Sequence, residues 1–474
     1  MLGTYERGAL GESVVNKKYH KLKHIHMIGI GGTGMNGIAE VLLNLGYKVS
    51  GSDIQDNEAT QRLTRLGAEV HIGHRGEQIN GSDVVVISSA ITEENVEVKE
   101  ARRQKIPVIP RAEMLAELMR MKHGIAVAGS HGKTSTTSMI AQVLEAGGFD
   151  PTIIVGGRLN TVGAHAKLGA GDFIVAEADE SDRSFLYLSP FMAVLTNLDE
   201  EHLDQYKTLD EIKKTFIHFA NKVPFFCPII LCLDDANLQS LMPELERRVI
   251  TYGFSSQADI CARDHTFDKF RSTSALYYKS QNIGVLHLNV PGKHSIQNAM
   301  ASVAVGLDLD IPVPAILEAL EAYTGIGRRF ELKQNVNNIM IFEDYAHHPT
   351  EIIATLEAAK RGWSQRTVVV FQPHRYSRLS ALLKEFATSF NQADVLFITE
   401  VYSAGEMPIE GVTGQALYEE TQKFGHKNIY FEPELSKIPA RVAKIAEPGD
   451  LIFVLGAGSI NRIIPGLIKE LEKQ

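Results

Sequence analysis

Short apolar runs alternate with amphipathic stretches along almost the whole chain. This alternation predicts an α/β protein in which helices cover mainly parallel strands. The apolar runs predict strands at residues 26–30, 47–50, 84–87, 125–128, 173–176, 192–196, 229–233, 340–342, 368–371, 395–398 and 451–455. Residues 275–278 and 285–288 lie in a more polar stretch whose pattern predicts two antiparallel strands.

The chain has 474 residues, which exceeds the usual size of one domain. A new strand opens just after Lys122, and a glycine-flanked joint stands at Gly325-Ile326-Gly327. These breaks predict three α/β domains at 1–121, 122–326 and 327–474. Residues 1–22 are polar and are expected to form a loose tail.

Composition narrows the class of protein. Hydrophobic residues make up 44% and charged residues 22%, as in soluble globular proteins. No apolar run approaches the ~18 residues of a membrane span, and no apolar leader is visible, so a cytoplasmic protein is expected. A net charge of −9 without a dominant Lys/Arg cluster argues against nucleic acid as a partner. The three cysteines lack paired spacing and are expected to be buried thiols.

A glycine loop follows the strand predicted at 125–128. It reads Gly129-Ser130-His131-Gly132-Lys133-Thr134 and continues through Ser135 into a helix with an apolar stripe. In such a loop, backbone N–H groups surround phosphates, the lysine reaches the β- and γ-phosphates, and the hydroxyl of Thr134 binds Mg²⁺. Val127 stands where the common motif has its first glycine. An accidental Gly-Lys-Thr turn is the alternative, and the strand-loop-helix order favours ATP binding.

Acidic residues follow the next two predicted strands. Glu177 ends the strand at 173–176 and is placed to bind Mg²⁺, although a solvated acidic turn would look the same. His202 lies among carboxylates after the strand at 192–196. From the residues alone, His202 is equally a metal ligand or a structural histidine.

The first domain carries a second glycine pattern. Gly29-Ile30-Gly31-Gly32-Thr33-Gly34 follows a strand, and Asp53 ends the next one. The pattern predicts a diphosphate and ribose site, which suits either NAD or a UDP-linked sugar. Ser88 lies in a turn that either lines the same site or caps the following helix.

The last domain opens with Arg328 and Arg329. Two of its predicted strands end in polar clusters, Asp344 to Pro349 and Gln372 to Arg378. Each cluster is either part of a site or a solvated turn, and with the arginine pair they favour a site.

Together these segments resemble the Mur ligases of peptidoglycan synthesis, over essentially the whole chain after about residue 22. The residues that carry the resemblance are the first glycine pattern with Ser52-Asp53, Gly129–Thr134, Glu177–Asp182, Asn197–His202, Asn298-Ala299, Arg329, Asp344–Pro349, Gln372–Arg378 and Tyr402–Glu406. The shortened phosphate loop is the form that this family carries. The sequences at Asp344–His348 and Tyr402–Glu406 are most similar to those of the members that add L-alanine.

The resemblance implies an activity. UDP-N-acetylmuramate would be activated by ATP as an acyl phosphate, and L-alanine would displace phosphate to form an amide. The first domain would be the Rossmann-like UDP-substrate domain, the second the P-loop ATPase-type domain, and the third a C-terminal Rossmann-like domain.

The resemblance also implies residue roles. Lys133, Glu177, His202 and Arg329 would be catalytic, with Thr134, Glu177 and His202 holding Mg²⁺. The ATP-binding set would be Gly129, Ser130, His131, Gly132, Lys133, Thr134, Ser135, His294, Asn298, Arg329 and Asp344. The set that binds the UDP-sugar and the amino acid would be Gly31, Gly32, Thr33, Gly34, Asp53, Ser88, Tyr345, His347, Arg375 and Arg378.

Several relatives bridge their metals with a carbamylated lysine, but the segment Lys213 to Ile217 does not align one, and the role stays unassigned. Because the site residues are spread over three domains, we expect the enzyme to close on its substrates. Three alternatives stay open: a recycling ligase that adds a whole peptide, an NAD-dependent dehydrogenase, and a non-catalytic ATP-binding switch.

Overall fold

The computed structural model describes residues 22–474 except 89, 160–163, 181–182 and 200–205. The predicted tail at 1–22 therefore lies almost wholly outside the described residues. The chain divides into two compact units, one of residues 1–118 with 166–168 and one of the remaining residues. This division does not test the three predicted domain ranges, which stay predictions.

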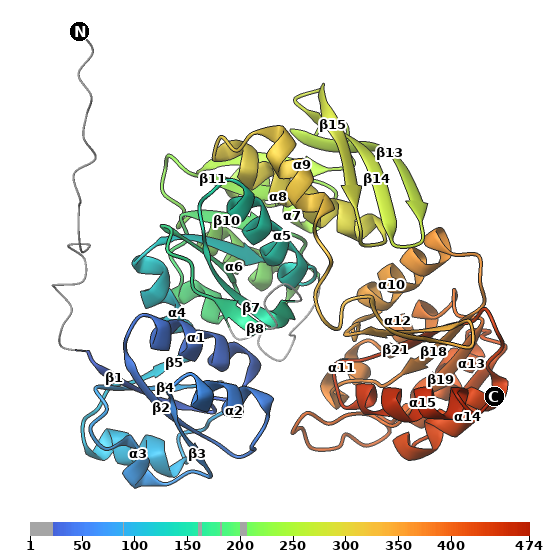
Figure 1. Cartoon of the computed structure of the whole chain (residues 1–474), viewed down its shortest axis with the longest axis horizontal. Coiled ribbons are helices and arrows are strands. Elements are labelled where there is room, and N and C mark those ends of the chain that lie inside the picture. Colours follow the sequence, from blue (N-terminus) through green and yellow to red (C-terminus); the bar gives the residue numbers. More distant parts are fainter. Residues whose placement is uncertain (1–21, 89, 160–163, 181–182, 200–205) are drawn as a thin grey trace. The chain divides into compact units, whose positions relative to one another are not determined.

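The first unit contains a five-stranded parallel sheet in the order β3-β2-β1-β4-β5 (Figure 1). Its strands are β1 (His24–Ile28), β2 (Lys48–Asp53), β3 (Glu69–Ile72), β4 (Val84–Ile87) and β5 (Val108–Pro110). Its helices are α1 (Thr33–Asn44), α2 (Glu58–Arg65), α3 (Val96–Arg103) and α4 (Arg111–Arg120), the last of which crosses into the second unit. The order, with β1 between β2 and β4, is that of a Rossmann-like fold.

A ten-stranded sheet in the order β15-β14-β13-β12-β11-β10-β6-β9-β7-β8 belongs to the second unit except for the end of β8. Its strands are β6 (His123–Ala128), β7 (Thr152–Leu159), β8 (Ala164–Lys167), β9 (Phe173–Glu177), β10 (Met192–Leu195), β11 (Pro228–Cys232), β12 (Arg248–Gly253), β13 (Ile260–Asp268), β14 (Arg271–Tyr278) and β15 (Gln281–Leu288). The main helices are α5 (Lys133–Ala146), α6 (Leu209–Ala220), α7 (Ala236–Gln239), α8 (Lys293–Asp308) and α9 (Val313–Glu321). The predicted antiparallel strands are confirmed as β14 and β15.

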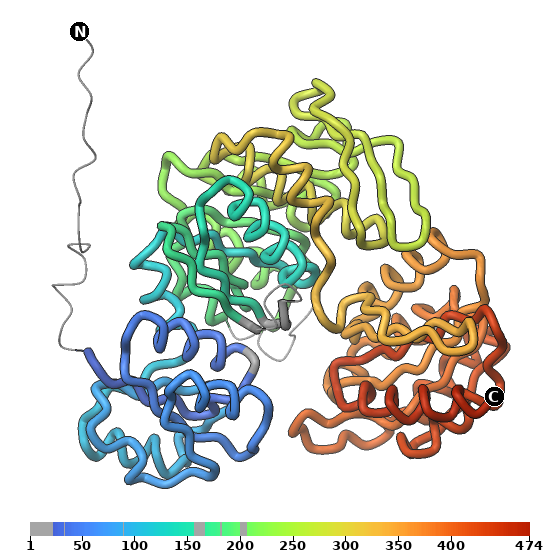
Figure 2. Tube along the Cα trace, viewed as in Figure 1, coloured from blue at the N-terminus to red at the C-terminus, as the bar shows by residue number. Residues whose placement is uncertain are grey.

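The same unit contains a six-stranded sheet in the order β16-β17-β21-β18-β19-β20. Its strands are β16 (Glu331–Val336), β17 (Ile339–Asp344), β18 (Thr367–Phe371), β19 (Val395–Ile398), β20 (Ile429–Phe431) and β21 (Leu451–Leu455). Its helices are α10 (Pro349–Gly362), α11 (Tyr376–Ala381), α12 (Leu383–Ser389), α13 (Gly414–Lys423), α14 (Ile438–Ile445) and α15 (Ile464–Leu471). Each of the three sheets takes its strands from one stretch of chain, as the colours of the trace show (Figure 2).

The core of the six-stranded sheet lies on both of its faces. Phe342, Phe371 and Phe453 pack in one buried cluster, while Ile341 and Ile452 pack in another. Neighbouring strand residues thus point into different clusters, as expected for a parallel sheet covered by helices on both sides. The α/β fold predicted from the apolar runs is confirmed.

Two simple predictions from composition can be compared with the described residues. The three cysteines are free and buried, as expected. Among the residues described, no helix is long and apolar enough to cross a membrane.

The strand predicted at 26–30 begins and ends two residues earlier, at His24–Ile28. Gly29 has a φ of 79°, and the amides of Gly29 and Ile30 both donate to the carbonyl of Ser52. The chain therefore leaves the strand at the glycine, although Ile30 is apolar and fully buried.

Candidate functional site

The phosphate loop joins β6 to α5, in the order that the sequence predicted. Gly132 stands directly before α5 with a φ of 79°, and Gly129 has a φ of 138°. A Cβ on Gly129 would lie 2.1 Å from Oγ1 of Thr196, so the loop passes too close to the neighbouring strand end for any side chain there.

Residues after β10 fix the loop. Ser130 N donates to the carbonyl of Asn197 at 3.2 Å, and His131 N donates to Oδ1 of the same asparagine at 2.7 Å. Thr196 Oγ1 and Asn197 Nδ2 both donate to the carbonyl of His131, at 2.7 and 3.0 Å. β10 and β6 are adjacent parallel strands, which explains why their C-terminal ends meet here.

Lys133 is paired with a buried carboxylate. Its Nζ donates to both oxygens of Glu180, at 2.7 and 2.9 Å, and to the carbonyl of Gly129 at 2.6 Å. Burial raises the pKa of Glu180 to about 7, against the opposing effect of Lys133. Lys133 is thus held beside the backbone of the loop by a buried carboxyl group.

A cavity of about 970 Å³ lies beside the loop, within the size range of nucleotide and drug sites. It is lined by residues of the ten-stranded sheet's domain and by residues after the joint at Gly325. Eight of the predicted ATP-binding residues line it: His131, Gly132, Thr134, Ser135, His294, Asn298, Arg329 and Asp344. The structure therefore brings most of the predicted nucleotide set around one space.

Several of these residues are fixed by their neighbours. Asp344 ends β17 and accepts hydrogen bonds from Phe330 N at 2.9 Å and Ala346 N at 2.8 Å. Arg329 Nη1 lies 3.2 Å from Oε1 of Glu351, which holds the guanidinium at the cavity wall. Desolvation lowers the pKa of His294 to about 4, with Arg329 adding to the effect. His294 is therefore neutral at neutral pH and can accept a hydrogen bond.

The donors predicted for Mg²⁺ can be tested for fit. Thr134 lies in the first turn of α5, and Glu177 ends β9, where it pairs in register with Val127 of β6. Both offer hard oxygen ligands at the C-terminal edge of adjacent strands, which suits Mg²⁺. His202, Ser181 and Asp182 lie outside the described residues. Lys213 and Lys214 lie on α6, with Lys214 exposed.

Four residues predicted to bind the amino acid and muramoyl group lie at the C-terminal ends of β17 and β18. The rings of Tyr345 and His347 are 5.2 Å apart, and His347 is 5.8 Å from the ring of His374. Arg378 Nη1 lies 3.3 Å from His374 Nδ1. Arg375 has a φ of 69° and donates its backbone N–H to Tyr402. His374 therefore links the two predicted clusters.

In the first unit, the glycine pattern between β1 and α1 lies against the ends of β2 and β4. Gly31 N donates to Oδ2 of Asp53 at 2.9 Å. Gly32 stands directly before α1, which begins at Thr33 and contains Gly34. A Cβ on Gly29 would lie 2.9 Å from Oγ of Ser88. The predicted residues of this set thus meet at one sheet edge.

Some groups that the structure places in or beside these sites carry no local sequence pattern. Glu180 is one of several acidic residues in the run Glu177–Asp182, and its pairing with Lys133 depends on the adjacency of β9 and α5. Glu351, His374 and Glu97 were likewise not assigned. The sequence could have drawn attention to Glu97 by its position. It is a charged residue in the first turn of α3, the helix that Asn95 caps.

Comparisons with known proteins agree with this architecture. Residues 24–123 match the Mur ligase family catalytic domain, residues 127–306 the Mur ligase middle domain, and residues 328–458 the Mur ligase glutamate ligase domain. The chain belongs to the Mur ligase family.

Individual members of the family are similar to this chain over almost its whole length. The UDP-N-acetylmuramate–L-alanine ligase of Geotalea daltonii is 52% identical over 455 residues, which cover 96% of this chain and 99% of that protein. The crystal structure of the UDP-N-acetylmuramate–alanine ligase of Thermotoga maritima has a TM-score of 0.81 at 27% identity, covering 95% of this chain and 99% of that one. A murein peptide ligase of Psychrobacter arcticus has a TM-score of 0.71 at 25% identity, with the same coverage.

Proposed function

We propose that the chain is an ATP-dependent UDP-N-acetylmuramate–L-alanine ligase, which makes a peptidoglycan precursor and releases ADP and phosphate. The observation that carries the proposal is the cavity beside the phosphate loop. It is lined both by the loop and by Arg329 and Asp344. The stretch of chain that follows Arg329 also carries the polar cluster around His374. The 52% identity with an alanine ligase over nearly the whole chain supports the choice of substrates.

The proposed chemistry joins two anions, so its main demand is charge neutralisation. The muramoyl carboxylate attacks the γ-phosphorus of ATP, and ADP leaves with the electrons of the broken P–O bond. Lys133 and Arg329 stabilise the charge that develops on the phosphate oxygens. Loop amides at the N-terminus of α5 orient the same oxygens.

The amine of L-alanine then attacks the acyl carbon, and phosphate leaves from the tetrahedral intermediate as hydrogen phosphate, which balances the proton that the nitrogen loses. Arg375, Arg378 and His347 are proposed to hold the carboxylates of the reacting partners, since two guanidinium groups match carboxylate geometry. Asp344, Asn298 and His294 are proposed to contact the nucleotide. Gly31, Gly32, Thr33, Gly34, Asp53 and Ser88 are proposed to bind the UDP portion.

Mg²⁺, when bound, would shield the phosphate charge, and Thr134 and Glu177 are the described residues proposed to hold it. His202 is proposed as a further ligand on the resemblance alone.

Phosphate release from ATP tests the proposal. With UDP-N-acetylmuramate present, steady release should require L-alanine, and the amide product should appear in equal amount. Release that does not depend on L-alanine would contradict it. Replacing L-alanine with a tripeptide tests the recycling reaction of the murein peptide ligases, and a preference for the tripeptide would assign that function instead.

A further inference from the structure

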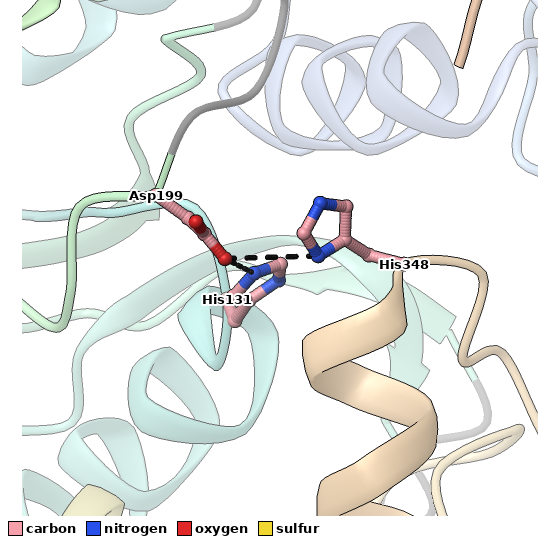
Figure 3. A group of neighbouring side chains, drawn as sticks. All are labelled: His131, Asp199 and His348. Atoms are coloured by element: carbon pink, nitrogen blue, oxygen red, sulfur yellow. Dashed lines mark hydrogen bonds and ion pairs between the residues drawn. The ribbon is translucent and has the colours of Figure 1, made fainter. Parts of the chain in front are cut away.

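Three side chains with metal-binding atoms converge beside the phosphate loop. His131 belongs to the loop, Asp199 follows β10, and His348 directly precedes α10 (Figure 3). Oδ2 of Asp199 lies 3.2 Å from Nε2 of His131 and 3.7 Å from Nδ1 of His348. One ligand atom from each residue lies within 4.8 Å of the other two.

These separations fit a tetrahedral ion. With metal–ligand bonds of about 2.0–2.1 Å, two ligands of one tetrahedral ion stand roughly 3.3–3.4 Å apart. The distances from Asp199 to the two imidazole nitrogens, 3.2 and 3.7 Å, bracket this value. The two rings are neighbours, with centroids 4.9 Å apart and one nitrogen of each within 4.8 Å of the other.

Outer groups already orient the ligands. Oε1 of Glu351 lies 3.7 Å from Nδ1 of His131, on the side of the ring away from Asp199. Without an ion, the 3.2 Å contact with Asp199 needs a hydrogen on Nε2. A metal ion would replace that hydrogen, and a carboxylate beside Nδ1 favours the tautomer that keeps its hydrogen on Nδ1. Thr350 Oγ1 donates to Oδ2 of Asp199 at 2.8 Å and fixes that carboxylate.

The donor set distinguishes this cluster from the proposed magnesium site. Two imidazoles and one carboxylate suit Zn²⁺, Co²⁺ or Ni²⁺, whereas Mg²⁺ prefers oxygen ligands and an octahedral shell. We propose that His131, Asp199 and His348 form a binding site for a transition-metal dication of the Zn²⁺ type, distinct from the site at Thr134 and Glu177. Such an ion would tie the phosphate loop to the start of α10.

Co²⁺ titration of the untagged, full-length protein without nucleotide tests the site. We expect one equivalent to bind with the intense visible absorption of a four-coordinate Co²⁺ ion, and Zn²⁺ to displace it. His348→Ala and His131→Ala should each lose at least ~10-fold in affinity, because each removes a ligand. His218→Ala is the matched control, since His218 is an exposed histidine on α6, and it should bind as the wild type does.

Two further measurements separate the loss of a metal ligand from a general loss of structure. Glu351→Gln retains all three ligands and should weaken Co²⁺ binding by roughly 10-fold through the orientation of His131. Zn²⁺ should raise the Tm of the wild type but not that of His348→Ala, provided that circular dichroism shows both to be folded. Only weak six-coordinate Co²⁺ spectra, or wild-type affinity in His348→Ala, would overturn the proposal.

Discussion

Two glycine loops in this chain have the same strand-loop-helix plan but differ in the group that anchors them. In the first unit, the loop between β1 and α1 is anchored by a carboxylate, since Gly31 N donates to Asp53. In the second unit, the loop between β6 and α5 is anchored by a neutral amide, since His131 N donates to the side chain of Asn197. Lys133 adds a positive charge only to the second loop's sequence.

The difference shows that a glycine pattern alone does not define the ligand. A carboxylate beside loop amides repels phosphate and attracts hydroxyl groups, as a sugar or ribose offers. A neutral amide anchor adds no such repulsion, and with a lysine it suits a triphosphate. The charge of the anchoring residue, on the neighbouring strand, thus separates the two proposed nucleotide sites.

Lys133→Ala tests the second loop most severely. We expect alanine-dependent phosphate release to fall by about 10²–10³-fold, because the transition state loses a cation near the transferred phosphate. Measured phosphate release and binding of UDP-N-acetylmuramate check this, and the binding should not change. Lys133→Ala combined with Glu180→Gln is the control for stability, since it also removes the buried carboxylate. Unchanged turnover would remove Lys133 from the mechanism.

Gly129→Ala and Gly31→Ala compare the two loops directly. At Gly129 the new Cβ would meet Thr196 Oγ1 at 2.1 Å and the carbonyl of Asn197 at 2.8 Å, at a φ of 138°. The strain alone costs about 1–3 kcal/mol, so we expect a large loss of ATP binding. At Gly31 the nearest atoms, at 2.8–3.0 Å, belong to the side chains of Thr60, Asn57 and Asp53 rather than to backbone, and the φ of Gly31 is not in the left-handed region.

Gly31→Ala should therefore have a smaller effect, confined to the KM for UDP-N-acetylmuramate. The KM values of both substrates, measured for both variants, check the pair. If both variants weakened the same substrate, the assignment of one loop to each nucleotide would fail.

Glu97→Gln probes what holds the first loop in place. Glu97 is fully buried, and its Oε2 accepts a 2.5 Å hydrogen bond from Ser52, whose carbonyl binds the loop amides. Because hydrogen bonds to charged groups contribute roughly 1.5–3 kcal/mol, we expect a loss of unfolding free energy of that size at neutral pH. Urea unfolding measures it. Glu94→Gln, which removes an exposed pair with Lys99, is the control and should change little.

We also expect the effect of Glu97→Gln on the unfolding free energy to depend on pH. Burial opposes the charge on Glu97, but His26 and Ser52 outweigh it and lower its pKa. A carboxyl group with a lowered pKa contributes stability above its ordinary pKa of about 4.3, and that stability is lost as the pH falls through the lowered pKa. The difference between wild type and Glu97→Gln should thus shrink in acid. A constant difference would argue against an ionised Glu97.

Asp53→Asn should have the smallest effect. The amide oxygen can still accept from Gly31, so only the charge is lost, and we expect about fivefold weaker binding of UDP-N-acetylmuramate, or roughly 1 kcal/mol. Calorimetry measures the change, and the KM for ATP should stay constant. Tighter binding of the UDP-sugar would mean that the carboxylate repels the diphosphate more than it binds hydroxyl groups.

Much of the fold could be predicted because buried parallel strands are almost wholly apolar. The strands at 84–87, 395–398 and 451–455 have the predicted bounds. β13 was not predicted, since its second half is polar and partly exposed, and its pairing with β14 contains a bulge. β2 extends to Asp53 through polar residues because β1 and β3 pair with it on both sides.

Site residues that are neighbours in the sequence could be predicted. Contacts between residues that are far apart in the sequence were harder to predict. The loop Gly129–Thr134 could be read directly. The contacts of Glu351 with Arg329 and His131 depend on how α10 lies against the loop, which no local pattern encodes. Such long-range contacts follow from sheet order and helix packing.

The pairing of Lys133 with Glu180 bears on turnover. A phosphate that approaches Lys133 has to share the ammonium group with a carboxylate that already accepts two hydrogen bonds from it. The net attraction of Lys133 for a phosphate is then the energy of that new interaction minus the energy lost from the interaction with Glu180. If Lys133 binds the phosphates as proposed, Glu180 recovers both hydrogen bonds when ADP departs, and the same carboxylate that limits the affinity for ATP favours product release.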